Sequence, residues 1–531
     1  LHFFDGFRTS HEIQKINTLE DDEIKKIIKN YFIDFKNDFQ EKQFGTAQNP
    51  DVFFQNREKN QYKYNSVKEN LKDIFADLNA LTGNNYDIFE YYGNENAENI
   101  IVAMGSSCKT IEQYIDYNPD KKIGLIKVRL YRPFYSDLFI EKIPSTCKVI
   151  TVLDRTKENG SIAPLALDVI SALQQNNKNL KVIYGRYGLG GKDFSLNDVN
   201  AVFENMTTDK INDFTVGIID DVNNNSLDVK PYYFKDECTE IKIFGLGSDG
   251  SVSASKSTIK ILGESFDKNV QGYFEYDSKK SGSLTISHLR LSDKPIKSEY
   301  LLKFADVISI NNFSFVPRYN CLEGLKQNGI VVINSIFNKD EIDKVIPVDY
   351  VKKLKETNSK LYLINAQKIA NECGLGQKIN IIMQTALFKC ANLLNDEQIK
   401  TEISKYIESM FITKGKSVVE KNIKAMNMAL DSTEIVDVNT LTGKQYKSEK
   451  NIENDFYKQI MSPIEKLKGN EIPVSKFSDD GSTPLATSQY EKRGIALRLP
   501  KWIKENCIQC GQCVLACPHS ALRAILVDED L

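Results

Sequence analysis

The sequence lacks the features of a membrane, secreted or nucleic-acid-binding protein. None of its apolar runs approaches the ~18 residues that a membrane-spanning helix needs. Its net charge is only -3, with 69 Lys and Arg residues against 72 Asp and Glu residues, so it offers a polyanion no broad basic field. Its first residues do not form a charged segment followed by an apolar one. We therefore expect a soluble protein that binds neither a membrane nor nucleic acid.

Histidine is scarce, with four residues in a chain of 531, and this excludes a histidine-rich metal site. Of the ten cysteines, six are scattered without a pairing rhythm: Cys108, Cys147, Cys238, Cys321, Cys373 and Cys390. Such spacing does not suit a disulfide framework. It suits a reducing compartment and a single metal site, because the other four cysteines lie close together near residue 510.

The clustered cysteines have the C-x2-C-x2-C-x3-C-P spacing of bacterial-type ferredoxins: Cys507, Cys510, Cys513 and Cys517, then Pro518. In that pattern the first three thiolates hold one [4Fe–4S] cluster and the fourth binds a second cluster. Structural zinc is the rival, but its sites usually pair two knuckles across a longer loop. No cysteine follows Cys517, so both clusters lack ligands. We expect this chain to be an internal fragment of a longer polypeptide.

From about residue 83 to 232, short runs rich in Ile and Val alternate with helical stretches. Continuous apolar runs separated by helices indicate a parallel sheet covered on both faces. Ligands of such sheets bind beyond the carboxyl ends of the strands. The residues expected there are Gly105, Ser106, Ser107, Arg129, Arg132, Asp154, Arg155, Lys157, Glu158 and Gly160. Charged groups at strand ends are often only solvated, so the pattern alone assigns none of them a ligand.

A second α/β unit begins at TEIKIFGLGSDGSVSASK, where an expected strand runs into Gly245-x-Gly247-x-x-Gly250 and then a helix. Glycines allow the backbone to approach an anion, which the free N–H groups and the helix dipole attract. The literal motif suggests a dinucleotide site. It is weak evidence by itself, because a tight strand-to-helix turn also uses glycines when no ligand binds.

The next expected strand, VQGYFEYDSKKSG, bears on that choice. A NAD site needs an acidic residue about 20 residues further on, and Asp277 lies near that place. Lys279 and Lys280 follow it directly. Two lysines favour a ligand with an additional phosphate, such as NADP or the 3′-phosphoadenosine end of coenzyme A. A solvated lysine pair explains the pattern about equally well.

Taken together, the motifs resemble those of the pyruvate:ferredoxin (flavodoxin) oxidoreductases. The segments that carry the resemblance are HFFDGFRTSHE, AMGSSCKTIEQ, KVRLYRPF, LDRTKENGS, GRYGLGGKDF, FGLGSDGSVSASK, YDSKKSGSLTISHLR, GLGQKINIIMQT, YEKRGIALRLP and CIQCGQCVLACPHSALR. The resemblance implies oxidative decarboxylation of pyruvate with coenzyme A to acetyl-CoA and carbon dioxide. Electrons would leave through two [4Fe–4S] clusters to ferredoxin or flavodoxin.

The resemblance also implies thiamine diphosphate and magnesium in the parent enzyme, a homodimer, and a cytoplasmic location, or a hydrogenosome-like organelle in an anaerobic eukaryote. It implies a multidomain α/β protein with open parallel-sheet domains. The expected parts are the tail of a thiamine pyrimidine-binding domain (1–82), a transketolase C-terminal-like domain (83–232), a catalytic gamma domain (233–445), an EKR-type linker (446–485) and an incomplete two-cluster ferredoxin-like domain (486–531).

The family's coenzyme A site corresponds here to Ser248, Asp249, Gly250, Ser251, Val252, Lys280, Asn380 and Asn422. The metal ligands implied are the four cysteines of the C-terminal motif. The family's catalytic residues around pyruvate and thiamine match nothing in this chain, so no catalytic residue can be named. We expect the chain alone to be inactive.

Two alternatives remain open from the sequence. One keeps the chemistry and changes the acceptor or the acid, as in a pyruvate:NADP oxidoreductase fused to a flavin reductase, or an enzyme for another 2-oxoacid. The other is a non-catalytic iron–sulfur scaffold that uses the same domains.

Overall fold

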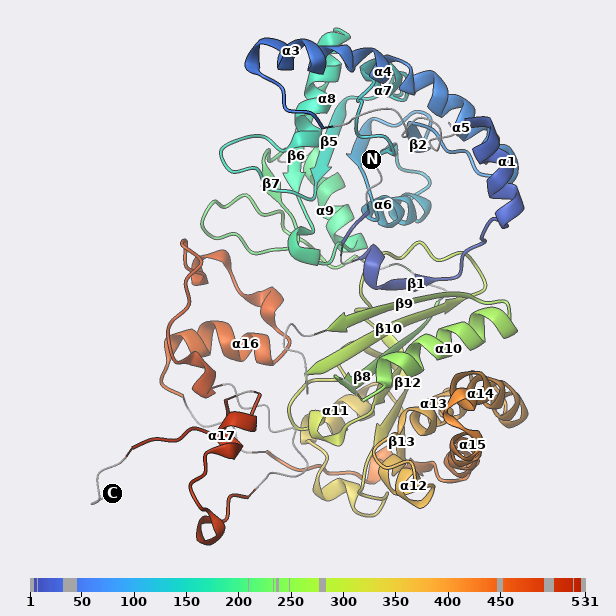
Figure 1. Ribbon diagram of the computed structural model, residues 1–531, viewed down its shortest axis with the longest axis vertical. Helices are drawn as coiled ribbons and strands as arrows, with labels where there is room; N and C mark the ends of the chain where they lie inside the picture. Colours follow the sequence, from blue (N-terminus) through green and yellow to red (C-terminus); the bar gives the residue numbers. More distant parts are fainter. Residues whose placement is uncertain are drawn as a thin grey trace. The chain divides into compact units, whose positions relative to one another are not determined.

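The computed structural model divides the chain into two compact units, residues 1–485 and 486–531. It describes residues 4–6, 8–31, 45–208, 210–232, 234, 238–247, 249–276, 283–446, 452–490, 501–518 and 520–526. The first unit contains two sheets flanked by helices (Figure 1), which confirms the α/β class. Among the described residues, no helix is both long and apolar enough to cross a membrane.

The first sheet has the strand order β2-β4-β3-β5-β6-β7 and is parallel except at its β2 edge. Its strands are β2 (Phe89–Gly93), β3 (Asn99–Ala103), β4 (Ile123–Val128), β5 (Val149–Asp154), β6 (Lys181–Arg186) and β7 (Phe214–Thr215). Its helices are α6 (Ser107–Asp116), α7 (Ser136–Glu141), α8 (Pro164–Gln175) and α9 (Leu196–Thr207). Separate apolar clusters pack on its two faces, as the continuous apolar runs predict.

The second sheet has the order β1-β9-β10-β8-β11-β12-β13-β14. Its strands are β1 (Glu12–Gln14), β8 (Thr239–Leu246), β9 (Asn269–Tyr276), β10 (Leu284–Ser292), β11 (Ala305–Ile310), β12 (Leu325–Asn334), β13 (Lys360–Ile364) and β14 (Glu434–Val436). Only β8, β11, β12 and β13 pair in parallel. Strand β10 lies between β8 and β9 and is antiparallel to both, so the sheet is mixed. The antiparallel insertion is not visible in the apolar runs.

Helices cover both faces of the second sheet. They are α10 (Ser251–Ser265), α11 (Val348–Glu356), α12 (Ala366–Glu372), α13 (Asn380–Cys390), α14 (Asp396–Phe411) and α15 (Lys416–Asp431). Apolar side chains of α10, α13, α14 and α15 pack on one face, and those of α11 pack on the other. Figure 1 shows the first group gathered on one side of the sheet.

The N-terminal residues contribute to both sheets. β1 pairs with β9 through Ile13 opposite Gly272, at the edge of the second sheet. Beyond it come α1 (Asp21–Tyr31), α3 (Pro50–Lys59), α4 (Gln61–Asn65) and α5 (Val67–Thr82). On α5, Leu71 and Phe75 pack against the core of the first sheet. Residues 452–485 form short turns and α16 (Ser462–Glu465), and the second unit contains α17 (Gln512–Ala516).

Candidate functional site

The turn between β8 and α10 is the GxGxxG segment, and its geometry requires glycine at two positions. Gly250 has φ +88° and caps the N-terminus of α10. A Cβ atom on Gly245 would lie 2.4 Å from the Cβ of Ser251. The glycines therefore bring the helix start against the end of its own strand, as the sequence predicts.

The Asp249 carboxylate organises this turn. It accepts hydrogen bonds from the Leu246 N–H at 2.8 Å, the Ser251 N–H at 2.7 Å and the Ser251 hydroxyl at 2.8 Å. The Asn311 side chain, just beyond β11, donates to the same hydroxyl at 2.8 Å. The first amide of α10 is therefore capped by a carboxylate of the chain, and a phosphate must use other groups of the loop.

A second helix begins at the same place. A Cβ atom on Gly250 would lie 3.1 Å from the side-chain nitrogen, Nδ2, of Asn380, the first residue of α13. The N-termini of α10 and α13 thus lie together and both direct positive helix-dipole ends toward the loop. Behind them, buried Gln384 of α13 donates to Ser257 at 2.8 Å and to Thr258 at 3.1 Å, which ties the two helices together.

The other residues predicted for this site differ in position. Asn422 is buried on α15, and its amide donates to the Val418 carbonyl at 2.8 Å. α15 packs against α13 through apolar side chains. Val252 is half-buried, and its side chain packs against the core beside the loop. Ser248 and Lys280 lie outside the described residues.

The cysteine motif lies in the second unit. Cys507, Cys510 and Cys513 are exposed, Cys517 is half-buried, and none forms a disulfide. Gly511 has φ +71° and starts α17. The Cys517 sulfur accepts the Ala521 N–H at 3.3 Å, a bond of the kind that tunes thiolate ligands.

Free thiols on a short turn with a left-handed glycine suit an iron–sulfur cluster. Nonetheless, no group of three His, Cys, Asp or Glu side chains converges within the part of the chain that the structure describes. The four cysteines stay a prediction of the sequence, and the structure shows that all four are thiols rather than disulfides.

A charged group that the sequence did not single out lies between the two sheets. Arg8 stacks 4.4 Å from the Tyr273 ring centroid, and its Nε donates to Glu12 at 2.8 Å. The same Nε lies 3.4 Å from Glu299. Burial raises the pKa of Glu12 to about 7, with Arg8 opposing the shift and Glu299 adding to it. Local sequence patterns do not reveal this group, because Tyr273 and Glu299 lie more than 250 residues from Arg8.

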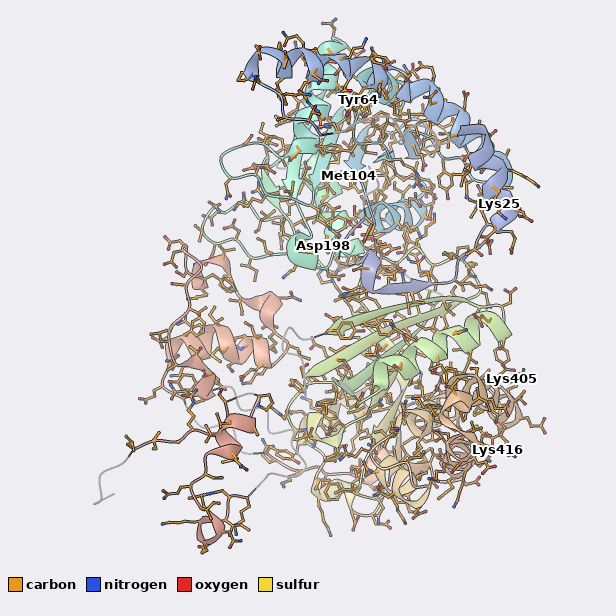
Figure 2. All side chains as sticks on the ribbon, in the orientation of Figure 1. Lys25, Tyr64, Met104, Asp198, Lys405 and Lys416 are labelled. Atoms are coloured by element: carbon orange, nitrogen blue, oxygen red, sulfur yellow. The ribbon has the colours of Figure 1, made fainter. Side chains whose placement is uncertain are left out.

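The strand-end residues of the first sheet fall into separate roles. Gly105, Ser106 and Arg155 surround the carboxylate of Asp5. They lie next to Met104, which Figure 2 labels. Asp154 is structural, because its oxygens accept the first amides of α8, from Leu165 and Ala166, at 3.2 Å each.

Two other strand-end cations pair with acids of the first sheet and of its helix α8. Arg129 forms an ion pair with Glu90, and Arg132 lies 2.7 Å from Asp168. A Cβ atom on Gly160 would meet nothing within 4 Å.

Comparison with known proteins gives five family matches in chain order. They are pyruvate flavodoxin/ferredoxin oxidoreductase, thiamine diphosphate-binding (1–76), pyruvate:ferredoxin oxidoreductase core domain II (97–199), pyruvate ferredoxin/flavodoxin oxidoreductase (240–432), the EKR domain of unknown function (444–496) and the 4Fe-4S binding domain (500–523).

Whole-chain relatives agree with these matches. The chain is 44% identical over 548 residues to the pyruvate:ferredoxin oxidoreductase of Moorella thermoacetica, covering 99% of the chain and 46% of the relative. It is 40% identical to the pyruvate-flavodoxin oxidoreductase of Trichormus variabilis, again over 99% of the chain and 46% of the relative. It is 39% identical to the pyruvate dehydrogenase [NADP(+)] of Cryptosporidium parvum, over 100% of the chain and 30% of the relative.

The structure is an α/β chain whose second unit carries four clustered cysteines inside the match to the 4Fe-4S binding domain. The five matches together span most of its length, and the chain belongs to the pyruvate:ferredoxin/flavodoxin oxidoreductase family. It spans about half the length of the bacterial relatives it matches.

Proposed function

We propose that this chain is part of an enzyme that oxidatively decarboxylates pyruvate with coenzyme A and passes the electrons to ferredoxin or flavodoxin. The observation that carries the proposal is the 44% identity to a pyruvate:ferredoxin oxidoreductase along 99% of the chain. The NADP-dependent relative matches the same residues at 39% identity, so the acceptor is the part of the proposal most open to test.

We propose that coenzyme A binds at the loop after β8. The residues proposed to contact it are Ser248, Asp249, Gly250, Ser251 and Val252, with Lys280, Asn380 and Asn422 from other parts of the chain. Two helix N-termini and the Asn380 amide support an anionic ligand here, because they direct N–H groups and positive dipole ends to one point. The Asp249 carboxylate repels a phosphate placed on the first amide of α10. The ligand phosphates are therefore expected on the Asn380 side of the loop.

Holding coenzyme A at a fixed loop serves acyl transfer. A thiol held by its distal phosphates reacts with a neighbouring acyl group as an effectively intramolecular partner. The α10–α13 pair is rigidly packed through Gln384, so its contribution is to orient the ligand rather than to supply a proton.

The thiolates of Cys507, Cys510, Cys513 and Cys517 are proposed to hold iron–sulfur clusters. Such clusters, when bound, accept and pass on single electrons. The exposure of the first three thiols in this chain leaves them accessible for assembly with iron and sulfide.

We also propose that the domains expected from the sequence are functional divisions of the chain. Their boundaries are 1–82, 83–232, 233–445, 446–485 and 486–531. A homodimer and a cytoplasmic or organellar location are likewise proposed for the parent enzyme. The relatives' names support the redox partners and leave these points to experiment.

The experiment is a turnover assay of the polypeptide that contains this chain. Reduction of ferredoxin should require both pyruvate and coenzyme A, and NADP should not replace ferredoxin. Turnover without coenzyme A would contradict the acyl-transfer role. Direct reduction of NADP would instead place the chain with its NADP-dependent relative.

A further inference from the structure

The carboxyl edge of the first sheet has a point where the strand order reverses. From β3 the chain passes to β4 on one side and then crosses to β5 on the other side. Ligands of open α/β sheets bind in the crevice outside the strands at such a switch point. In this protein, a side chain from the N-terminal segment lies there, and that side chain is Asp5.

The Asp5 carboxylate is held as a small free carboxylate would be. One oxygen accepts the Ser106 N–H at 2.5 Å, and the other lies 3.0 Å from Nη1 of Arg155. A Cβ atom on Gly105 would lie 2.9 Å from both oxygens, so only glycine leaves room for them. The Asp5 side chain is 13% exposed.

The binding groups are positioned by the sheet and not by Asp5. The Arg155 guanidinium lies 5.2 Å from the ring centroid of buried Tyr187, whose hydroxyl is 2.7 Å from Ser107. A Cβ atom on Gly188 would lie 2.6 Å from the Arg155 Nε. Within the described residues, that buried Nε has no hydrogen-bond partner.

A cavity of about 1030 Å³ opens beside this contact. Its lining includes Asp5, Gly105 and Ser106. Its other charged side chains are the cations Lys109, Lys127 and Arg129 and the carboxylates Glu12, Glu112 and Glu299. Solvent anions of a few atoms can therefore reach the carboxylate position once it is vacated.

We propose that the β3/β5 crevice is a carboxylate-binding site whose resident ligand is Asp5 of the same chain. The contact of Asp5 with Ser106 and Arg155 fixes the N-terminal segment to the first sheet. Strand β1 begins seven residues further on and pairs with β9 of the second sheet. The segment from Asp5 to Gln14 thereby joins the two sheets, and the ligand class that replaces Asp5 is a small monocarboxylate.

Chemical rescue tests this proposal on the full chain. Asp5→Ala lacks the carboxylate group, and formate can fill the space that it leaves. Asp5→Gly lacks the carboxylate and the methylene group, and acetate can fill that larger space. Formate should raise the melting temperature of Asp5→Ala by at least about 2 °C over chloride at equal ionic strength. The wild type and Asp5→Asn, whose sites are filled, should not respond.

The double variant Asp5→Ala with Arg155→Met should lose the response, because the guanidinium is gone. A response of equal size in the wild type, or one retained in the double variant, would overturn the proposal. If Asp5→Ala does not fold alone, refolding decides: formate should restore soluble chain and chloride should not. Absence of recovery in formate would count against the site.

Discussion

At the scale of single residues, carboxylates of the chain take positions that an anionic ligand could occupy. Asp249 caps α10, Asp154 caps α8 and Asp5 binds at the start of α6. Each satisfies amides that a helix start leaves unpaired. The glycine motif therefore has a structural role before any ligand binds, and Asn380 is the side chain beside the loop that we propose contacts coenzyme A.

Glu12 gives the residue-scale prediction. Burial raises its pKa from 4.5 to about 7, so the folded chain binds this proton more tightly than the unfolded chain does. The resulting stability is present below pH 4.5 and is lost as the pH rises through 7. The free energy of unfolding of Glu12→Gln should therefore rise relative to that of the wild type between pH 5 and pH 8, by up to about 3 kcal/mol.

Urea denaturation at the two pH values measures this difference. The groups that face Glu12 are Arg8, Gln14, Gln271 and Glu299, and none is altered by the substitution. Exposed Glu20→Gln is the matched control and should show no such trend. The assignment fails if both variants follow the wild type in parallel.

At the scale of elements, the loop depends on how α10 and α13 are joined. Gln384 donates to two hydroxyls that themselves donate to the Ala254 carbonyl, while its own Oε1 has no partner among described residues. The hydroxyls keep a hydrogen bond even if Gln384 is replaced. An acceptor in place of the Gln384 donor would face only the lone pairs of the Ser257 and Thr258 hydroxyls, whose protons are already donated to Ala254.

Two substitutions separate these effects. Gln384→Met should change the free energy of unfolding by less than about 1.5 kcal/mol, since shape is kept and an unpaired oxygen is removed. Gln384→Glu should cost at least about 3 kcal/mol, because it buries an uncompensated charge. Chemical denaturation of both variants measures this, and equal losses would show that the helices are not joined in this way.

The sequence predicted some helices and strands correctly and gave no sign of others. The apolar runs predicted β3, β4, β5 and β6 of the first sheet but not its edge strands β2 and β7, and Gly245 to Gly250 predicted the strand-to-helix turn. The position of β10 between β8 and β9 was not predictable, because Leu284 pairs with Leu246 through contacts that no local pattern records. Asp5 escaped notice for the same reason, since its partners are about 100 and 150 residues away.

At the scale of the whole molecule, the chain combines a unit that holds two α/β sheets with a separate unit that bears the clustered cysteines. The cysteine spacing predicts Cys507, Cys510, Cys513 and Cys517 as sulfur donors. It does not predict their arrangement, because in that pattern a complete cluster depends on a fourth thiolate from elsewhere in the polypeptide.

That dependence leads to a prediction about metal content. The isolated chain, reconstituted with iron and sulfide, should bind well under one complete cluster, because Cys507, Cys510 and Cys513 supply three thiolates of four. Iron and acid-labile sulfide analysis measures it, with Cys510→Ser as the control that should remove what binding there is. A stoichiometric cubane in the isolated chain would refute the incomplete-ligand account.

The central claim is that the loop after β8, with Asn380, binds coenzyme A. Equilibrium binding of coenzyme A to the full chain by titration calorimetry tests it most directly. Asn380→Ala should weaken binding about tenfold or more, the loss of roughly 1.4 kcal/mol expected for one hydrogen bond to a charged ligand. Exposed Asn371→Ala, on α12, should bind as the wild type does. Equal affinity of both variants, or no binding by the wild type, would contradict the claim.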